Sequence, residues 1–514
     1  MRSSSALQSD EVKAGAIRSL LSETGAEALP IWLETRRWFA DKGRDISGAV
    51  IEDALVERVG PDWLALAVAR VAFADGGTAR YLLPLALTES PGEAETITTV
   101  ASGDIAGVVV DSTVRPWFGG WLLDRLARGS DPAHGNWSFV AHPAASADIS
   151  AARGTASTAV HAEQSNSSLR FDDILILKLF RRLQPGLNPD EEVLRALADV
   201  NFARVPRFLG SVTWRSPDAA MYAVGLAQGF VSNVGDGWVW MLQRLAAVAA
   251  GVVDPRVDRF VAERLLGQRT GELHVALGTV PDQEFAPETT DSAAIVADIA
   301  RTRAATDETI QLLQEQWGHL PESIASRLPD AIEGLRELSE RVNGYWDEQG
   351  TRRVRVHGDY HLGQTLRTPD RDWVIIDFEG EPARSLEERR QRASVLKDVA
   401  GMLRSFAYAR GAAERAAGDA SDPAAKGRLE DWEIGARRAF LEGYRHALAG
   451  SHRQFVPEDD EGFARALAAW ELDKALYEVA YEARNRPNWL ELSLRSLLPE
   501  VLDQAADTAG GAPA

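Results

Sequence analysis

The spacing of apolar residues changes near residue 230 of this 514-residue chain. Before that point, short segments alternate between apolar and polar residues as strands do, whereas most of the remainder places apolar residues at helical spacing. A strand-rich half followed by a helix-rich half predicts an α+β fold with two lobes, and it argues against alternating βαβ units. Two short apolar runs, 354–356 and 373–376, predict strands inside the helical half.

The strand-rich half divides into two parts. A helical start followed by segments that alternate between apolar and polar residues predicts a small α+β unit over residues 1–104. A second part follows over 105–230, and the helix-rich half covers 231–514. Residues 128–160 are rich in Ala, Ser, Gly and His, and they predict a loop-like connection.

Composition excludes several classes of function. The chain has 56 Lys and Arg against 76 Asp and Glu, a net charge of −20, so we expect no nucleic-acid or anionic-membrane partner. It has no cysteine, which excludes disulfides, thiolate nucleophiles and cysteine zinc sites. The sequence shows neither a signal peptide nor a membrane-spanning apolar stretch, so we expect a cytoplasmic protein.

Three polar residues near the run 354–356 have spacings suited to phosphoryl transfer. Asp359 lies in a loop, Gln364 follows five positions later, and Asp377 comes directly after the run 373–376. Phosphoryl transfer needs a base for the nucleophile's proton and cations on the phosphates. We therefore predict that Asp359 is the base and that Gln364 and Asp377 offer oxygen ligands to Mg²⁺.

This segment resembles the catalytic and metal-binding motifs of protein kinases, H-R-D-x4-N and D-F-G. Gly358 replaces the Arg, Gln364 replaces the Asn, and Glu379 replaces the last Gly. Aminoglycoside-phosphotransferase-like small-molecule kinases show the same departures. The resemblance implies an ATP-dependent kinase that acts on a small molecule.

A nucleotide site also needs a cation, and the apolar strand 174–180 contains one, Lys178. A buried strand rarely carries an unpaired charge, so Lys178 requires an acidic partner. A helix with acids in its first turn begins a few residues later. We predict an ion pair between Lys178 and Glu192, with Glu191 as the alternative.

Two further segments are candidates for contact with ATP. The polar turn 163–168 can cover phosphates with hydroxyls and backbone N–H groups, although it also fits an ordinary hairpin. Gln228 and Phe230 lie where the two halves meet, at the position of an adenine-binding hinge. The candidate residues of the turn are Gln164, Ser165, Asn166 and Ser167.

A third set of polar residues suggests the acceptor site. Lys474, Tyr477, Glu478 and Tyr481 share one face of a predicted helix, and a following turn carries Trp489. Aromatic rings mixed with charged groups suit the apolar and hydroxyl faces of a sugar. The alternative is a solvated face held by salt bridges.

Seven segments, spread over most of the chain, resemble those of bacterial maltokinases and occur in the same order. They begin at Arg36 (RRWFADKGR), Glu163 (EQSNS), Lys178 (KLFRR), His357 (HGDYHLGQ), Asp377 (DFEGEP), Lys397 (KDVAGMLRSF) and Tyr477 (YEVAYEARNRP).

The resemblance implies a bilobal protein-kinase-like fold with an N-terminal strand-rich cap domain at 1–104, a kinase N-lobe at 105–230 and a large helical C-lobe at 231–514. It implies transfer of the γ-phosphate of ATP, with Mg²⁺, to the anomeric hydroxyl of maltose. In the family, maltose 1-phosphate feeds α-glucan (glycogen) synthesis, with maltose supplied from trehalose.

The resemblance implies that the residues named above have the same roles as their counterparts in the family. It also implies that His361 is a maltose-binding position. Glucosamine kinases are close to the same family, so a kinase for glucosamine or another small sugar is an alternative. An aminoglycoside-modifying enzyme and a non-catalytic pseudokinase scaffold are the remaining rivals. The cap domain either stiffens the nucleotide lobe or docks a trehalose-converting enzyme.

Overall fold

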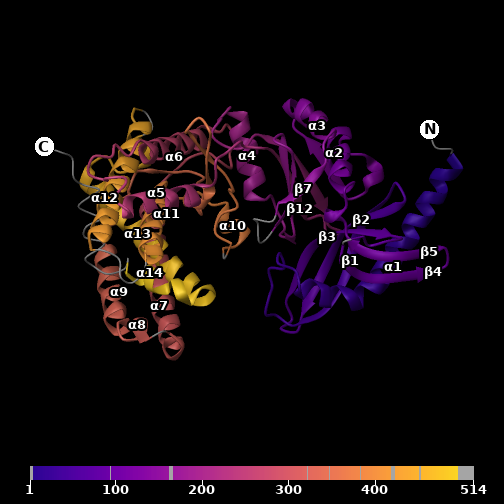
Figure 1. Ribbon diagram of the computed structural model, residues 1–514, viewed down its shortest axis with the longest axis horizontal. Coiled ribbons are helices and arrows are strands. Elements are labelled where there is room, and N and C mark those ends of the chain that lie inside the picture. The colour runs from indigo at the N-terminus through magenta and orange to yellow at the C-terminus, as the bar shows by residue number, and fades with distance from the viewer. Residues whose placement is uncertain are drawn as a thin grey trace. The chain divides into compact units, whose positions relative to one another are not determined.

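The computed structural model describes residues 4–495, except for Glu93, 161–165, Pro321, Asp347, Ala383, 418–422 and 451–452. It divides into two compact units. Unit 1 contains Met1–Glu192 and Pro206–Phe230, and unit 2 contains Val193–Val205 and Val231–Ala514. Figure 1 labels many of the elements of both units.

Unit 1 opens with helix α1 (Ser4–Glu34) and an antiparallel sheet, called here the cap sheet. Its strands run in the order β1-β2-β3-β5-β4, and the short strand β10 pairs with β3. Helix α1 packs on β1 and β4, and apolar side chains from the helix and the sheet form one buried core. The strands are β1 (Ile46–Val59), β2 (Asp62–Phe73), β3 (Thr78–Thr88), β4 (Thr96–Ser102), β5 (Ile105–Asp111) and β10 (Arg182–Leu183).

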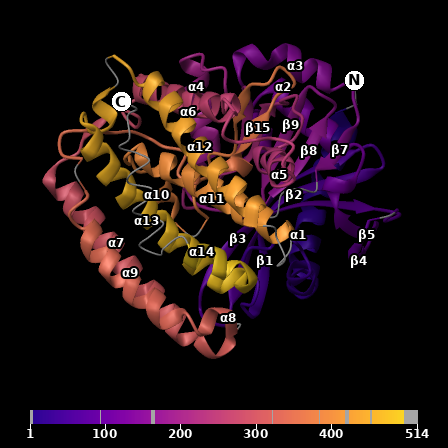
Figure 2. The same ribbon diagram turned by 60° about the vertical axis from the view of Figure 1, so that its left-hand side comes forward.

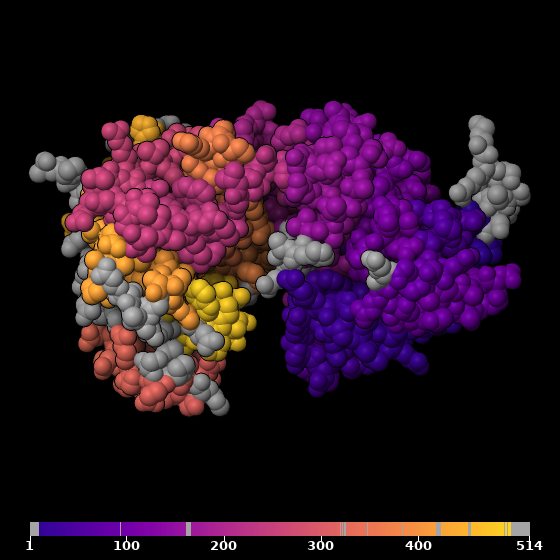
Figure 3. Space-filling view, viewed as in Figure 1, coloured from indigo at the N-terminus to yellow at the C-terminus, as the bar shows by residue number. Residues whose placement is uncertain are grey.

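The second sheet of unit 1 is also antiparallel, in the order β6-β11-β12-β9-β8-β7. Because β10 follows β9 at once in the chain, the backbone passes directly from this sheet into the cap sheet. In the space-filling view, the two sheets of unit 1 form one continuous body (Figure 3). The strands are β6 (Trp137–Ala141), β7 (Ser157–Val160), β8 (Asn166–Phe171), β9 (Leu175–Phe180), β11 (Phe208–Arg215) and β12 (Met221–Gly229).

The loop predicted for residues 128–160 is wrong. This stretch contains β6, helix α3 (Ser146–Ala152) and β7, and it follows helix α2 (Phe118–Arg128). Trp137 and Phe139 alternate along β6 and are both buried, which is a strand pattern that the polar neighbours obscured. The Ala content reflects a short helix, because Ala has the highest helix propensity.

Unit 2 is mainly helical, and α11 contacts α5, α12 and α13 at its centre. The long helices α7 and α9 run side by side (Figure 2). No helix among the described residues is long and apolar enough to cross a membrane. The helices are α5 (Gly237–Ala249), α6 (Val261–Thr279), α7 (Ser292–Glu315), α8 (Glu322–Ala325), α9 (Leu328–Val342), α10 (Leu386–Arg389), α11 (Leu396–Ala417), α12 (Pro423–Ala447), α13 (Asp460–Asn485) and α14 (Leu490–Arg495).

Two small hairpins interrupt these helices. The predicted strand 373–376 is confirmed as β16 (Trp373–Ile375), which pairs with β15 (Thr365–Arg367). The strand predicted at 354–356 lies two residues earlier, as β14 (Arg352–Arg353) paired with β13 (Glu288–Thr289). Helix α4 (Pro189–Asp199) begins in unit 1 and ends in unit 2. The predicted α+β fold with a strand-rich N-terminal domain is therefore confirmed.

The remaining elements are short 3₁₀ helices. They are η1 (Ser112–Val114), η2 (Pro132–His134), η3 (Pro143–Ala145), η4 (Trp317–His319), η5 (Leu362–Gln364), η6 (Arg453–Phe455) and η7 (Pro487–Trp489).

Candidate active site

In unit 2, the hairpin of β15 and β16 brings Gln364 and Asp377 together. Gln364 ends η5, and its carbonyl oxygen accepts a hydrogen bond from Ile376 N at 3.0 Å. Its side-chain Nε2 donates to Asp377 Oδ2 at 3.1 Å. Asp377 has φ +66°, a left-handed conformation that is uncommon for a residue with a side chain and that is enriched at functional sites.

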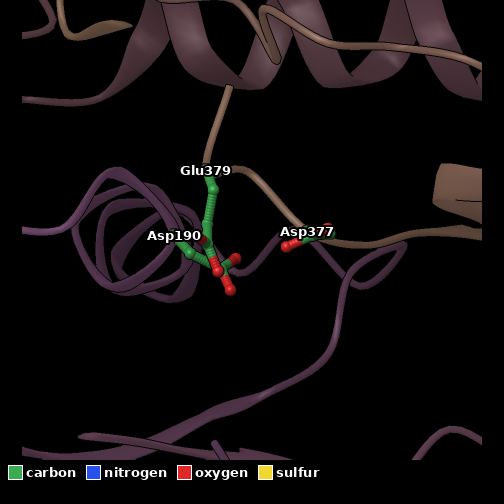
Figure 4. A group of neighbouring side chains, drawn as sticks. All are labelled: Asp190, Asp377 and Glu379. Carbon is green, nitrogen blue, oxygen red and sulfur yellow. The ribbon is translucent and has the colours of Figure 1, made fainter. Parts of the chain in front are cut away.

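The loop that follows β16 offers carboxylate oxygens. Figure 4 shows the side chains of Asp377 and Glu379 on this loop. Carboxylate and amide oxygens are the ligands that Mg²⁺ accepts in proteins, so the donor set of Gln364, Asp377 and Glu379 suits that ion. Glu379 was not among the predicted ligands.

A second aspartate, Asp398 at the start of α11, supports the loop that carries Asp359. Asp398 Oδ2 accepts from His357 N at 2.7 Å, and Oδ1 accepts from Gly358 N at 2.9 Å. The His274 ring also bonds Oδ2, at 3.1 Å. Burial raises the pKa of Asp398, but His274 and these hydrogen bonds outweigh burial and lower it, which keeps the carboxylate charged.

Asp359 contacts a buried cation. Lys474 Nζ on α13 donates to Asp359 Oδ1 at 2.9 Å and to Glu381 Oε1 at 3.1 Å. Burial lowers the pKa of Lys474, but the two carboxylates outweigh burial and hold its pKa well above the ordinary value. The Asp359 side chain is 20% exposed, so it is the member of this chain of charges that solvent reaches most easily.

Unit 2 brings several of the predicted sugar residues together, and two of them also contact arginines. The Lys474 ammonium lies 4.6 Å from the centroid of the Tyr477 ring, and that ring stacks on Tyr481 at 6.3 Å. Glu478 pairs with Arg404, whose Nε is 2.9 Å from Glu478 Oε2. Trp489 lies beside the guanidinium group of Arg415, 5.2 Å from its ring centroid.

His361 belongs to the same loop as Asp359. Its Nδ1 accepts from Gly363 N at 3.0 Å, which fixes the ring at the start of η5. Burial lowers the pKa of His361, and therefore favours a neutral ring next to the base.

In unit 1, the nucleotide candidates lie on neighbouring strands. Lys178 lies on β9, is 4% exposed, and its Nζ is 3.2 Å from Asp190 Oδ2 in the first turn of α4. Asp190 is not one of the predicted partners, although it belongs to the same acidic turn as Glu191 and Glu192.

The remaining unit 1 candidates flank this strand. Asn166 and Ser167 begin β8, which pairs with β9, whereas Gln164 and Ser165 lie outside the described residues. Gln228 of β12 is paired with Ile176 of β9. Phe230 N donates to Ile174 O at 2.9 Å, so the hinge candidate is bonded to the start of the Lys178 strand.

Comparison with known proteins identifies the family. A family model of the maltokinase N-terminal cap domain matches residues 32–114. A glucosamine kinase of Mycolicibacterium smegmatis is 31% identical over 392 residues, which cover 75% of this chain and 88% of that protein. The chain belongs to the maltokinase-like kinases.

Further glucosamine kinases are similar to this chain. A glucosamine kinase of Streptacidiphilus jiangxiensis is 28% identical over 366 residues, covering 68% of this chain and 76% of that protein. A solved glucosamine kinase in complex with glucosamine, ADP and inorganic phosphate has a TM-score of 0.63 and 21% identity over 91% of this chain and 98% of that chain. A second crystal form has a TM-score of 0.65 and 22% identity over 93% and 98%. At these identities the structural likeness shows the fold, and the chain is a sugar kinase of that fold.

In this maltokinase-like kinase, three residues without a predicted role are connected by the structure to the predicted site: Asp398, Glu381 and Arg404. Each is a charged residue with at most 4% exposure. The sequence did hold a signal for them. A lysine or an acid on the apolar face of a helix cannot stay unpaired, so every buried charge implies a second one elsewhere.

Proposed function

We propose that this protein phosphorylates maltose at the anomeric hydroxyl, with ATP as the donor and maltose 1-phosphate and ADP as products. The observation that carries the proposal is the contact of Asp359 with Lys474 beside two stacked tyrosines. A cation next to the base disfavours an acceptor that carries its own ammonium group, and it suits a neutral sugar whose hydroxyls accept hydrogen bonds.

In this proposal Asp359 accepts the proton of the anomeric hydroxyl while the hydroxyl oxygen bonds to the γ-phosphorus. The bond from that phosphorus to the β,γ-bridging oxygen breaks, and ADP leaves with the electron pair. Lys474 holds the carboxylate of Asp359 in place, and the neutral His361 ring leaves the base free of a second competing charge. Lys178 contacts the phosphates of ATP.

Gln364, Asp377 and Glu379 would hold Mg²⁺ through oxygen atoms. When bound, the ion offsets the negative charge on the β- and γ-phosphates. Asp377 and Gln364 already face each other across 3.1 Å, so their oxygens can converge on one ion after the amide of Gln364 rotates. We place the reaction in the cytoplasm, at the entry of trehalose-derived maltose into α-glucan synthesis.

Glucosamine is the second candidate acceptor, because both named relatives are glucosamine kinases. A coupled assay with MgATP and maltose, glucose, glucosamine or kanamycin separates the candidates. We expect the highest kcat/KM with maltose, and a product whose phosphorus couples to the anomeric proton in ³¹P–¹H NMR. A higher kcat/KM with glucosamine would reject maltose while leaving the kinase assignment intact.

A further inference from the structure

Unit 2 contains a cavity of about 630 Å³ between the start of α6 and the middle of α12. These two helices pack side by side (Figure 2). A cavity of this size accommodates a small organic ligand. None of the residues that line it belongs to the predicted catalytic, metal or sugar site. The charges on its walls indicate which class of ligand it fits.

The acids that line the cavity are each within ion-pair distance of an arginine. The pairs are Asp258 with Arg244, Asp431 with Arg256 and Glu442 with Arg264. The last pair joins α12 to α6 across the cavity wall. Because the arginines offset these carboxylates, the acids do not keep an anion out of the cavity.

Two further arginines line the cavity without such partners. Arg259 lies just before α6 and Arg438 lies on α12, and both are exposed. Neither makes an ion pair with any residue that the structure describes. Two uncompensated guanidinium groups create a local positive potential in a chain whose net charge is −20. A guanidinium group binds two oxygens of a phosphate at once, so this part of the cavity suits a phosphate group.

Another part of the wall is apolar. Pro255, Val261 and Ile434 line the cavity, and Val261 is 65% and Ile434 39% exposed. Apolar side chains that are this exposed can still bury surface against the carbon skeleton of a ligand. Arginines beside an apolar wall therefore favour an organic phosphate over a free inorganic anion.

The shape of the cavity is fixed by Phe260, which lies between Arg259 and the first residue of α6. Phe260 has φ +47°, a conformation that is rare for a bulky residue. Its N–H donates to Asp258 Oδ1 at 3.0 Å, and its ring lies so close to Gly435 that a Cβ there would collide with it. A wall held in this way loses little conformational entropy when a ligand binds.

Helix α6 also connects the cavity to the hairpin beside the predicted metal ligands. In its first turn, Ala262 O accepts a hydrogen bond from Trp373 Nε1 at 2.8 Å. Further along, Arg269 makes two hydrogen bonds of 2.8 Å to the carboxylate of Asp372. Trp373 begins β16, and Asp377 follows two positions after that strand ends. A ligand that shifts the start of α6 would therefore shift the strand that leads to Asp377.

We propose that this cavity is a second ligand site, which binds an organic phosphate and changes the turnover of the kinase. Arg259 and Arg438 bind the phosphate group, whereas Val261 and Ile434 contact the carbon skeleton. Binding acts on Asp377 through α6 and β16, so the two sites are coupled. The ligand is a sugar phosphate or a nucleoside monophosphate, which share this chemistry. The site does not depend on which sugar the kinase phosphorylates.

Calorimetry on the full-length protein tests binding, with glucose 6-phosphate, AMP and uncharged glucose as probes. We expect at least one of the two esters to bind to the wild type. Arg259→Ala and Arg438→Ala should each weaken this binding about tenfold, and the double variant should lose it. The ester that binds more tightly distinguishes a sugar phosphate from a nucleotide. The proposal is wrong if neither ester binds, or if the double variant binds both as the wild type does.

Arg303→Ala is the matched control for both substitutions. Arg303 is also exposed and makes no ion pair with a described residue, but it lies on α7 and does not line the cavity. We expect this variant to bind the esters as the wild type does. Substitutions at exposed positions change stability little, so all of these variants should keep the wild-type melting temperature.

The rate at saturating ATP and sugar tests the coupling, because competition in the active site has no effect under these conditions. The ester that binds should change kcat by about twofold or more in the wild type and in Arg303→Ala. Without ester, the Arg259→Ala/Arg438→Ala variant should keep the wild-type kcat, and the ester should not change it. An unchanged wild-type kcat, or the same change in the double variant, would overturn the regulatory role. Rejection of maltose as the acceptor would leave this test valid with whichever sugar is phosphorylated.

Discussion

The strand that carries Lys178 and the loop that carries Asp359 hold their charged groups in different ways. Lys178 lies inside a sheet, between β8 and β12, and its position follows from regular backbone pairing. Asp359 lies on irregular backbone, whose N–H groups are held by the side chain of Asp398, a residue 39 positions later in the sequence. A strand needs only its neighbours, whereas this loop needs a buried carboxylate brought by a helix.

The largest expected effect tests the loop. Asp359→Asn keeps the size of the side chain but cannot accept a full proton, so kcat should fall by about 10³-fold. ADP affinity by calorimetry should stay within a factor of two, since Lys178 and its strand are untouched. Asp370→Asn changes an exposed acid of the same segment and should leave kcat unchanged. Near-normal turnover of the Asp359 variant would remove this residue from the role of base.

The second effect tests the strand. Lys178→Met removes the buried ammonium that pairs with Asp190, and kcat/KM for ATP should fall by about 10²-fold. The KM for the sugar should change little, which distinguishes this variant from changes on α13. Arg215→Met on β11 removes an exposed cation from the same sheet and serves as the control. A loss confined to the sugar KM would contradict a nucleotide role for Lys178.

The same contrast explains what the sequence predicted and what it missed. Lys178 stands out because it interrupts an apolar strand. Gln364 and Asp377 flank a hairpin with a short turn, so the pairing of its two strands brings them close together. The residue that supports the Asp359 loop lies much later in the sequence. Asp398 reaches the Asp359 loop through tertiary packing, which no local pattern encodes.

The loop prediction for 128–160 failed because its polar composition does not show that Trp137 and Phe139 are buried against the neighbouring strand β11. The prediction that Glu478 on α13 binds a sugar stays a prediction, and the structure adds that Arg404 of α11 pairs with its carboxylate. The spacing of residues shows which side chains share one face of a helix. Packing against other helices then decides which of those side chains can still reach a ligand.

The third effect tests the support of the loop. Asn at position 398 has one acceptor oxygen, so Asp398→Asn would leave an N–H of His357 or Gly358 without its partner. We expect kcat to fall about tenfold, with both KM values retained, because the loop shifts while the binding groups remain. Asp307→Asn, at an exposed position of α7, is the control. An unchanged kcat together with a lower melting temperature would reduce Asp398 to a role in stability alone.

The smallest effect concerns the pH dependence of stability at Glu381. Burial raises the pKa of Glu381, but Lys474, Lys397 and Arg384 outweigh burial and lower it below its ordinary value. A carboxylate with a lowered folded-state pKa stabilises the protein above the pKa of the unfolded chain, about 4.3, and that contribution is lost as the pH falls further. The raised pKa of Lys474 acts at the other end, because its contribution is lost only as the pH rises above about 10.

Urea unfolding of the wild type and of Glu381→Gln at pH 7 and pH 3.5 measures this contribution. The wild type should lose about 1 kcal/mol more than the variant between these two values, a small difference because pH 3.5 lies only about one unit below the pKa of the unfolded carboxyl. Glu387→Gln, an exposed acid on the nearby helix α10, should behave as the wild type does. If the wild type and Glu381→Gln lose the same free energy of unfolding, the Lys474–Glu381 ion pair contributes nothing to stability. Asp359 would then be the carboxylate that stabilises the charge of Lys474, and Lys474 would hold this base more tightly than its solvent exposure suggests.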